Sequence, residues 1–262
     1  MVEPLIDPTA RVHPSAVLGS GVKIGPFCVV GEDVELGANC HLISHCCLDG
    51  PSTFGHDNVF HPFSTIGLVA ADKKYQGERA QLVVGNHNQF REYANVHRGT
   101  AAGGMVTRIG SHNLLMPMSH VAHDCVLGDH NVIANYTGLS GHCVLGSYAT
   151  LAANSVIHQQ TRIGDYAFVG MCSAVNADVP PYVMAYGNPA RFLNVNRVGL
   201  DRANWTGERI QKMKIACKLL LRGRYRREVA LKKLQTMVKD EPAIQLLIDF
   251  VGQSERGLIR AE

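Results

Sequence analysis

A strict six-residue repeat limits what this chain can fold into. Large aliphatic or aromatic residues recur at every sixth position, a glycine often follows them, and a small residue or asparagine stands four positions later. The period shifts by one residue after Val96 and is otherwise kept wherever it occurs. The repeated residues are Val12, Leu18, Ile24, Val30, Leu36, Leu42, Leu48, Phe54, Phe60, Ile66, Val84, Phe90, Val96, Ile109, Leu115, Val121, Leu127, Ile133, Leu139, Leu145, Leu151, Ile157, Ile163, Val169 and Val175.

This period matches neither an amphipathic helix nor a hairpin, and it is typical of a parallel β-helix built from hexapeptides. We therefore predict a left-handed parallel β-helix in which three hexapeptides, each a short strand plus a turn, close one triangular coil. The repeated residue and the small residue should point inward, and glycine should relieve the backbone at the corners. A β-sandwich would show turn signals at roughly 8–12-residue intervals and a period of two, and neither is present.

Composition and cysteine placement favour a cytoplasmic protein. The chain is 46% hydrophobic and 18% charged, with no tract apolar enough to span a membrane and no secretory pattern at its start. Five of the eight cysteines fall on inward small-residue positions, where a free thiol packs as a compact apolar filler. No CxxC pair occurs, so structural thiols are favoured over metal or redox chemistry. The five are Cys28, Cys40, Cys46, Cys125 and Cys143.

Two segments lack the repeat and should form loops on the scaffold. Residues 67–81 are charged and are expected to be ejected from the prism, and residues 99–105 should form a smaller interruption. Long loops on a regular scaffold often carry function. Prolines between positions 180 and 189 end the repeats, so we expect a β-helix domain over residues 1–189 and a helical domain over residues 190–262 that covers the last coil.

The helical domain should contain three helices. Thr206 can cap the first, which should end near Gly223; the second should span about 227–240; and Pro242 should open the third. Apolar residues at helical spacing predict the buried faces. They are Ile210, Met213, Cys217 and Leu220 in the first helix, Val229, Leu234 and Met237 or Val238 in the second, and Ile244, Leu247, Ile248 and Val251 in the third.

Basic residues concentrate in this domain. Between residues 206 and 233, ten basic residues stand against two acidic ones. Such a patch attracts an acidic partner, which could be a nucleic acid, an anionic membrane surface or an acidic carrier protein, although a merely solvated helix face fits the charge alone equally well. The ten are Arg209, Lys212, Lys214, Lys218, Arg222, Arg224, Arg226, Arg227, Lys232 and Lys233.

Histidines gather in the second half of the repeats. Because residues 18 apart lie one above the other on successive coils, Gly141 should stack on His123 and His142 on Asp124. An imidazole with an adjacent carboxylate and a backbone N–H above it can act as a general base with an oxyanion donor. A single histidine in a turn is more often solvated or structural, so the prediction depends on the whole cluster. Its members are His120, His123, Asp124, His142 and His158.

The alternative of a metal site has less support. The carbonic anhydrases built on the same β-helix resemble this chain in coil architecture, and they need three converging histidines, two of them five residues apart. Here only His56 and His61 have that spacing, with no histidine 36 positions earlier. His112 and His130 stack at 18, but two histidines make an incomplete site. We expect no metal, and no glycine-rich nucleotide-binding unit or P-loop occurs either.

Several motifs together resemble the UDP-N-acetylglucosamine 3-O-acyltransferases, which catalyse the first step of lipid A synthesis. The resemblance extends over essentially the whole chain, including the loop DKKYQGE (72–78). The other motifs are HRGT (97–100), NLLM (113–116), SHVAHDC (119–125), SGH (140–142), the pair His158-Gln159, DVPPYV (178–183), GNPA (187–190) and RGLIR (256–260).

The resemblance implies a homotrimer with active sites in clefts between subunits. An acyl carrier protein, rather than a nucleic acid, would dock on the basic helices and deliver a 3-hydroxyacyl thioester on its phosphopantetheine, with no other cofactor. His123 would be the general base for the sugar 3-hydroxyl, Asp124 would support it, and the Gly141 N–H would hold the oxyanion. The resemblance assigns further contacts to substrate, namely Asp72, Lys74, His120, His142, His158 and Gln159, with Asn196 and Arg202 at the nucleotide.

The chain departs from the family pattern at the tail. Val198 stands where a Glu is usual and Ala203 where an Arg is usual, and the loop reads GERA in place of GEPT. Arg197 could substitute in nucleotide binding. A related enzyme that acylates a 3-amino sugar nucleotide therefore stays open as an alternative. A non-catalytic trimeric scaffold is a further alternative, against which the intact His123 and Gly141 argue.

Met171 occupies the position that limits acyl length in the family. It lies 48 residues, or 2.67 coils, from His123, which corresponds to an axial separation of roughly 13 Å at about 4.8 Å per coil. An extended chain of about ten carbons spans a similar length, so we predict a medium 3-hydroxyacyl donor. The simpler alternative is that Met171 only fills space at a turn.

Overall fold

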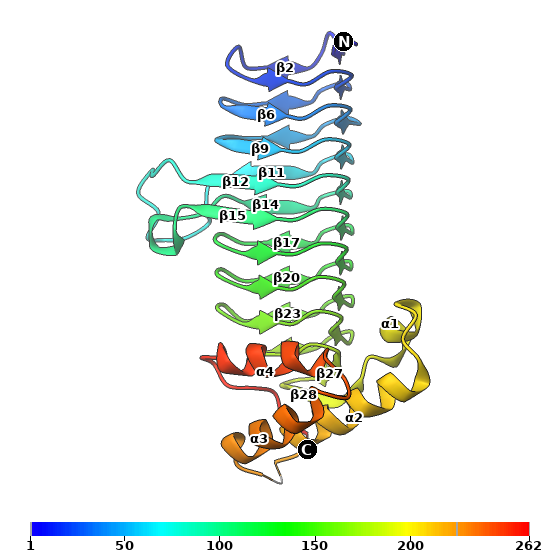
Figure 1. Cartoon of the computed structure of the whole chain (residues 1–262). Helices are drawn as coiled ribbons and strands as arrows, with labels where there is room; N and C mark the ends of the chain where they lie inside the picture. The colour runs from blue at the N-terminus through cyan, green and yellow to red at the C-terminus, as the bar shows by residue number, and fades with distance from the viewer. Residues whose placement is uncertain (1, 224, 262) are drawn as a thin grey trace.

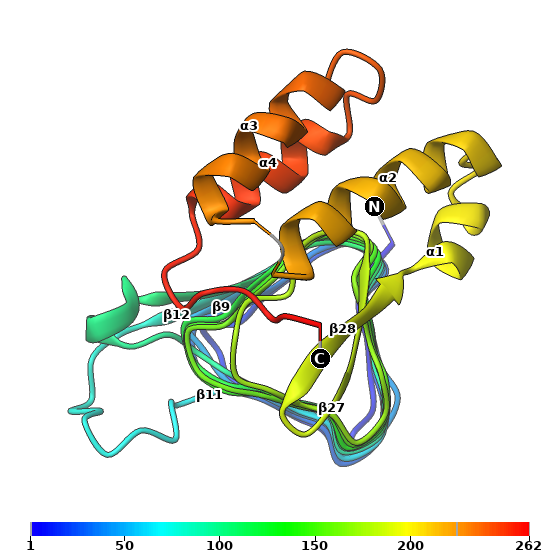
Figure 2. The same ribbon diagram turned by 90° about the horizontal axis from the view of Figure 1, so that it is seen from below.

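The computed structural model describes residues 2–223 and 225–261, and within them three parallel sheets wrap into a triangular prism (Figures 1 and 2). This is the left-handed parallel β-helix that the six-residue period predicts. Strands of one sheet pair in register with strands one coil away, for example Leu114↔Val132 and Val132↔Thr150. The first sheet contains β1 (Leu5–Ile6), β4 (Lys23–Ile24), β7 (His41–Leu42), β10 (Val59–Phe60), β13 (Gln89–Phe90), β16 (Leu114–Leu115), β19 (Val132–Ile133), β22 (Thr150–Leu151), β25 (Phe168–Val169), β27 (Val183–Gly187) and β28 (Ala190–Val195).

The other two sheets have the same short strands. The second contains β2 (Arg11–Val12), β5 (Val29–Val30), β8 (Cys47–Leu48), β11 (Thr65–Leu68), β14 (Asn95–His97), β17 (His120–Val121), β20 (Gly138–Leu139), β23 (Val156–Ile157) and β26 (Ala174–Val175). The third contains β3 (Val17–Leu18), β6 (Val34–Leu36), β9 (Ser52–Phe54), β12 (Gln81–Val84), β15 (Val106–Ile109), β18 (Val126–Leu127), β21 (Val144–Leu145) and β24 (Arg162–Ile163).

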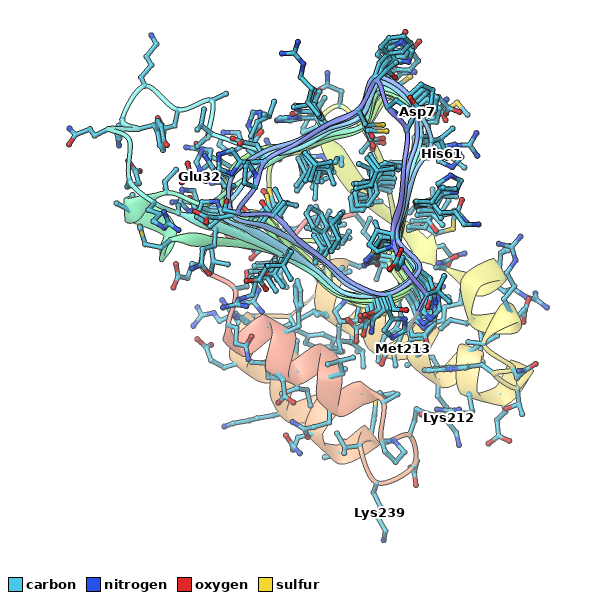
Figure 3. All side chains as sticks on the ribbon, turned by 90° about the horizontal axis from the view of Figure 1, so that it is seen from above. Asp7, Glu32, His61, Lys212, Met213 and Lys239 are labelled. Carbon is cyan, nitrogen blue, oxygen red and sulfur yellow. The ribbon has the colours of Figure 1, made fainter. Side chains whose placement is uncertain are left out.

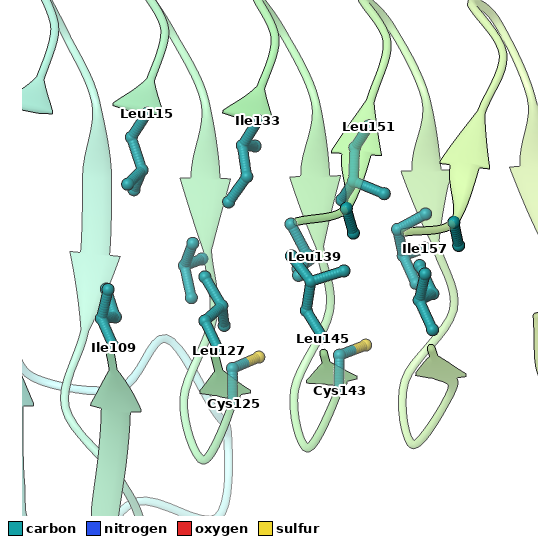
Figure 4. Close-up of a cluster of buried hydrophobic side chains, with 14 of the residues drawn as sticks. Ile109, Leu115, Cys125, Leu127, Ile133, Leu139, Cys143, Leu145, Leu151 and Ile157 are labelled. Atoms are coloured by element: carbon teal, nitrogen blue, oxygen red, sulfur yellow. The ribbon is translucent and has the colours of Figure 1, made fainter. Parts of the chain in front are cut away.

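The repeated residues fill the interior of the prism, as predicted (Figures 3 and 4). Phe60 and Phe90 are fully buried and stack with ring centroids 5.1 Å apart. Burial of each such side chain contributes about 1.5–3 kcal/mol. The asparagines on the small-residue positions form a ladder, because Asn88 Nδ2 donates to Asn58 Oδ1 at 3.0 Å and Asn113 Nδ2 to Asn88 Oδ1 at 3.1 Å. The polar groups of these three asparagines are thereby satisfied inside an apolar core, whereas Nδ2 of Asn131, the next asparagine of the ladder, has no partner among the described residues.

The five cysteines predicted to be inward are buried, and all eight cysteines are free thiols. Four of the buried thiols reach a backbone carbonyl: Cys40 Sγ lies 3.1 Å from the Gly55 oxygen, and Cys46, Cys125 and Cys143 make the same contact on later coils. These cysteines act as fillers of the core, as expected.

The role predicted for the repeated glycines is wrong. The corners are turned by non-glycine residues at positive φ, such as Asp124 (60°) and His142 (62°), whereas the glycines that follow the repeated residues, apart from Gly67 (83°), have no positive φ. A residue without a side chain is needed at these positions because the next coil approaches closely. A Cβ on Gly37 would lie 2.6 Å from the Gly55 carbonyl carbon, and one on Gly25 would lie 1.9 Å from the Ile43 oxygen.

Two loops leave the prism at one corner and lie side by side (Figures 1 and 2). The first is shorter than predicted, because β11 extends to Leu68 and β12 begins at Gln81. The second contains a 3₁₀ turn, η1 (Ala101–Gly103). Glu78 Oε1 accepts a hydrogen bond from the Ala101 N–H at 3.1 Å, which ties the two loops together.

The chain beyond residue 189 is not helical throughout. β28 pairs antiparallel with β27 and extends the first sheet, where we expected only helices. The last coil is covered as predicted, since Asp178 forms a bridge with Leu258 and the Phe192 N–H donates to the Arg260 oxygen. The C-terminal segment therefore occupies the edge that the repeats leave open.

The described residues form four helices, α1 (Arg197–Arg202), α2 (Gly207–Leu221), α3 (Arg227–Met237) and α4 (Ile244–Gly252). Thr206 caps α2 as predicted, by accepting from the Arg209 N–H. α3 ends earlier than predicted and buries Ala230 in place of Val229, which is 42% exposed. α2 buries Leu221 where we expected Leu220, and α4 begins two residues after Pro242.

The helix α1 in this domain was not predicted. It is capped by the Asn196 side chain, which accepts a hydrogen bond from the Gly199 N–H. None of the helices in the described part of the chain is long and apolar enough to cross a membrane. Arg224, one of the ten basic residues, lies outside the described residues.

Candidate active site

The predicted dyad forms at the corner where the two loops leave the prism. His123 follows β17, and its Nδ1 lies 2.8 Å from Asp124 Oδ2. The Asp124 side chain is fully buried, and its carboxylate also accepts from the Thr100 N–H at 2.8 Å and from the Thr100 hydroxyl at 2.6 Å. A carboxylate on Nδ1 favours the tautomer with the proton on that nitrogen. The other ring nitrogen, Nε2, is then free to accept a proton.

The ejected loop brings Asp72 to the other side of the same imidazole. Asp72 Oδ2 lies 3.8 Å from His123 Nε2, and the His123 side chain is 14% exposed. Lys74 is also on this loop; its backbone N–H donates to Asp72 Oδ1 at 3.0 Å, and the residue is exposed. A substrate hydroxyl placed near both His123 Nε2 and the Asp72 carboxylate would thus contact both residues.

The stacking predicted from the 18-residue interval is confirmed. A Cβ on Gly141 would lie 2.5 Å from His123 Cε1, so the Gly141 backbone passes directly over the ring. Among the residues that the structure describes, no acceptor takes the Gly141 N–H. His142 Nε2 lies 3.9 Å from Asp124 Oδ2, and the His142 and His123 rings meet edge to face at 5.1 Å.

His97 belongs to this site, and our prediction of site residues missed it. Its ring meets His120 edge to face at 5.1 Å, and His120 Nδ1 lies 2.7 Å from Asn95 Oδ1. Burial, with smaller effects from His120 and His123, lowers the pKa of His97 to about 4. Burial and His123 also lower the pKa of His120. Both imidazoles are therefore neutral near pH 7, where they can donate or accept hydrogen bonds to substrate.

Two adjoining cavities run along the outer face of the second sheet. One of about 300 Å³ is lined by His97, His120, His123 and Gly141 among others. The other, of about 260 Å³, extends toward the end of the prism and is lined by His158 and residues of β26. Ser140 and Val156 line both, so the two cavities form one groove that begins at the dyad.

The remaining predicted residues are spread more widely. His158 and Gln159 are exposed beside the second cavity, and the Gln159 carbonyl accepts from Arg256 Nη1 at 3.0 Å. Met171 is 59% exposed, in the turn before β26. Asn196 and Arg202 are not brought to His123 within one chain, because α1 lies on the opposite side of the prism from the loops (Figure 2).

Two clusters among the described residues could hold a metal ion. The donor atoms of His123, Asp124 and His142 lie within 4.8 Å of one another, and so do those of His56, Asp57 and His87. In the first cluster Asp124 Oδ2 already accepts from Thr100 and His123. These contacts suit the proton chemistry of a dyad.

A buried carboxylate behind an imidazole, a backbone N–H above that imidazole and a groove along a hexapeptide β-helix define an acyltransferase of the hexapeptide-repeat class. A family model described as domain 2 of UDP-N-acetylglucosamine O-acyltransferase matches residues 178–259. The bacterial transferase hexapeptide model matches residues 15–50 and 107–141.

Solved structures agree with these matches. The UDP-N-acetylglucosamine O-acyltransferase from Moraxella catarrhalis is 42% identical over 97% of this chain and 99% of its own, with a TM-score of 0.96. LpxA from Acinetobacter baumannii is also 42% identical, over 98% and 100%, with a TM-score of 0.96. The Arabidopsis UDP-N-acetylglucosamine acyltransferase is 30% identical over 98% and 100%, with a TM-score of 0.83. This chain belongs to the UDP-N-acetylglucosamine O-acyltransferase family.

Proposed function

We propose that this enzyme transfers a 3-hydroxyacyl chain from acyl carrier protein to the 3-hydroxyl of UDP-N-acetylglucosamine, the first step of lipid A biosynthesis. The observation that carries the proposal is the His123–Asp124 dyad beneath the Gly141 N–H, which has no acceptor among the described residues. Acyl transfer to an alcohol needs both a base for the hydroxyl and a donor for the oxyanion, and this corner offers both.

The reaction follows from these positions. His123 Nε2 takes the proton of the sugar 3-hydroxyl as its oxygen attacks the thioester carbonyl, and the Gly141 N–H stabilises the resulting oxyanion. When the tetrahedral intermediate collapses, the carbon–sulfur bond breaks and His123 returns the proton to the phosphopantetheine thiolate. The sugar ester and the free carrier thiol are the products. No further cofactor is needed, because the thioester supplies the activated acyl group.

The groove has room for the other substrate contacts. Asp72, His120 and His142 lie around the dyad and would contact the sugar, with His97 beside them. Lys74, on the same loop as Asp72, would also contact the sugar. His158 and Gln159 lie further along the groove. Asn196 is 7% exposed and its amide already donates to the Tyr166 oxygen at 2.8 Å, so any contact with the nucleotide would need a change in this bond. Exposed residues nearby, including Arg202, Arg197 and Val198, would form the remaining nucleotide surface.

A homotrimer is supported by the corner beside the second sheet. There a row of large apolar side chains is 45% to 57% exposed, more than one chain normally leaves uncovered. The cavity at the dyad, about 300 Å³, is at the lower end of the range for ligand sites, so a neighbouring subunit would supply the missing wall. The row consists of Phe27, Phe63, Tyr93, Met118 and Tyr136.

The carrier protein would dock on α2. Not all predicted basic residues are available, since Arg209 is paired with Glu241 and Lys212 with Glu208. Lys214, Lys218 and Arg222 recur at four-residue intervals and therefore share one face of the helix. This row would attract an acidic carrier protein. The free buried thiols also agree with the reducing cytoplasm as the site of the reaction.

The test is turnover of the purified protein with 3-hydroxyacyl carrier proteins of several chain lengths. UDP-N-acetylglucosamine and its 3-amino analogue are offered side by side, and products are identified by mass spectrometry. We expect an ester, formed fastest near a chain of about ten carbons, on the groove length estimated above. Amide formation alone would establish the 3-amino alternative, and no turnover with any donor would favour the non-catalytic scaffold.

The chain-length preference has its own variant. If Met171 ends the acyl groove, Met171→Gly should shift the preferred donor toward longer chains while the acceptor KM stays within about twofold, because only the far end of the groove changes. Competition between donors of different length, read by mass spectrometry, measures this shift. An unchanged preference would mean that Met171 only packs at its turn.

A further inference from the structure

The buried carboxylate of the dyad is held by a residue that does not touch the substrate groove. We propose that Thr100 is a positioning residue, which fixes the Asp124 carboxylate so that Asp124 holds the His123 ring with Nε2 directed at the acceptor. The inference rests on the proposed function of the dyad, and it adds a third residue that acts only through Asp124.

The contacts at Asp124 carry the argument. Thr100 is 3% exposed and donates twice, from its N–H to Oδ1 at 2.8 Å and from its hydroxyl to Oδ2 at 2.6 Å. Oδ2 is the same oxygen that lies 2.8 Å from His123 Nδ1. The 2.6 Å distance is typical of a hydroxyl bonded to an ionised carboxylate. A buried carboxylate without such donors is costly, and it would rotate or take up a proton.

The loop that bears Thr100 is closed tightly over the carboxylate. A Cβ on Gly103 would lie 1.9 Å from Asp124 Cγ, so only glycine fits there. The Thr100 carbonyl accepts from the Gly103 N–H at 3.1 Å and from the Met105 N–H at 2.9 Å, which fixes the turn. The Asp124 N–H donates to Thr107 Oγ1 at 2.8 Å, so the main chain of Asp124 is held from the strand after the loop.

The same loop is linked to the opposite side of the His123 ring. The Ala101 N–H donates to Glu78, and Glu78 belongs to the ejected loop that places Asp72 Oδ2 3.8 Å from His123 Nε2. The two loops thus lie on opposite sides of the imidazole, but only Nδ1 is held by a hydrogen bond, from Asp124. Removal of the Thr100 hydroxyl should loosen only the Nδ1 side, which affects proton transfer more than substrate binding.

The test compares Thr100→Val, Thr100→Ser and a matched control. Thr100→Val keeps the backbone donor and side-chain size but loses the hydroxyl, and we expect kcat to fall by about 10- to 100-fold, within the contribution of a general base, with KM within about twofold. Thr100→Ser should restore kcat to within about threefold of wild type. Thr161→Val is the control, because Thr161 is also fully buried but its hydroxyl has no partner among the described residues.

A double-mutant cycle separates positioning from general damage. If Thr100 acts through Asp124, Thr100→Val should lower kcat by less than about threefold in an Asp124→Asn background, because coupled residues are not additive. Full kcat in Thr100→Val, or equal multiplicative losses in both backgrounds, would overturn the inference.

A second readout does not depend on turnover. Side-chain ¹⁵N NMR of histidine, with the His123 signal assigned by its loss in His123→Gln, should show the Nδ1–H tautomer in wild type and Thr100→Ser and a mixture in Thr100→Val. An unchanged tautomer in Thr100→Val would overturn the inference. Absence of turnover in the wild-type enzyme would instead count against the proposed function, and the tautomer would still decide the role of Thr100.

Discussion

Two corners of the prism have the same backbone conformation but different functions. The ring corner, formed by His87, His112, His130, Tyr148 and Tyr166, turns at φ values of 56° to 60°. The site corner, formed by Asp124, His142 and Gln160, turns at 60° to 62°. In the ring corner the side chains stack on one another with centroids 4.6–4.9 Å apart, and His87 at its start also lies near Asp57.

The difference arises because both loops leave the prism at the site corner. His87 and His112 are 25 residues apart and still stack at 4.8 Å, although the interval within the regular coils is 18. The extra residues leave and return at the site corner, so the ring corner is unaffected. The regular coils thus give stability, and the interrupted coils bring Asp72, His97 and Thr100 to the dyad. The active site therefore forms where loops interrupt the repeat.

The largest effect should come from His123→Ala at the site corner. Loss of the general base should lower kcat by about 10³-fold, within the usual range for this form of catalysis. Steady-state turnover measures the loss, while size-exclusion chromatography and thermal unfolding show that assembly and fold are kept. Full activity in a folded variant would remove His123 from the mechanism and with it the contrast between the corners.

Gly141→Ala should have the next largest effect. Its Cβ would lie 2.5 Å from His123 Cε1, so either the imidazole or the Gly141 N–H must move, and we expect kcat to fall by about 10²-fold. Gly252→Ala is the matched control, because nothing lies within 4 Å of its Cβ. Kinetics of both variants at saturating substrate provide the comparison. Equal kcat values would mean that the coil above His123 has no part in the reaction.

These residues also show what the sequence could and could not predict. The period of six determined the architecture, and the interval of 18 placed Gly141 over His123. The same interval could not place Thr100 and His97 at the dyad. The inserted loop lengthens this coil, so Thr100 and Asp124 are separated by 24 residues. Asn196 is a good N-cap residue, so α1 could have been found from it. β28 was missed because a six-residue alternating strand after Pro189 is too short to exclude a helix.

At the ring corner we expect a change in stability without a change in rate. Tyr148→Ala removes two ring contacts, and aromatic pairs contribute about 0.5–1.5 kcal/mol each, so the free energy of unfolding should fall by about 1–3 kcal/mol. Tyr148→Phe keeps both stacks and should stay within about 0.5 kcal/mol of wild type. Urea unfolding followed by circular dichroism measures the difference, and kcat should be unchanged. A large loss of kcat in Tyr148→Ala would show that the two corners are coupled.

The smallest effect should appear where the row of rings reaches the helical domain. Beyond Tyr166 the row continues through Tyr182 to Trp205, and Arg209 lies 4.1 Å above the Trp205 ring. Arg209 also makes two hydrogen bonds of 2.9 Å to Glu241, which is 2% exposed. The hydrogen bonds from Arg209 lower the pKa of Glu241 below its usual value of 4.5.

A lowered carboxyl pKa fixes the sign of the pH dependence. The ion pair stabilises the folded state above pH 4.5, and this contribution is lost as the pH falls from 4.5 through the lower pKa of the folded state. Because Arg209 is half-exposed, we expect only about 1 kcal/mol at neutral pH. Thermal unfolding of wild type and Glu241→Gln should therefore differ at pH 7 and converge as the pH falls below 4.5. A difference that persists unchanged at low pH would mean that packing, and not the ion pair, joins the helical domain to the ring corner.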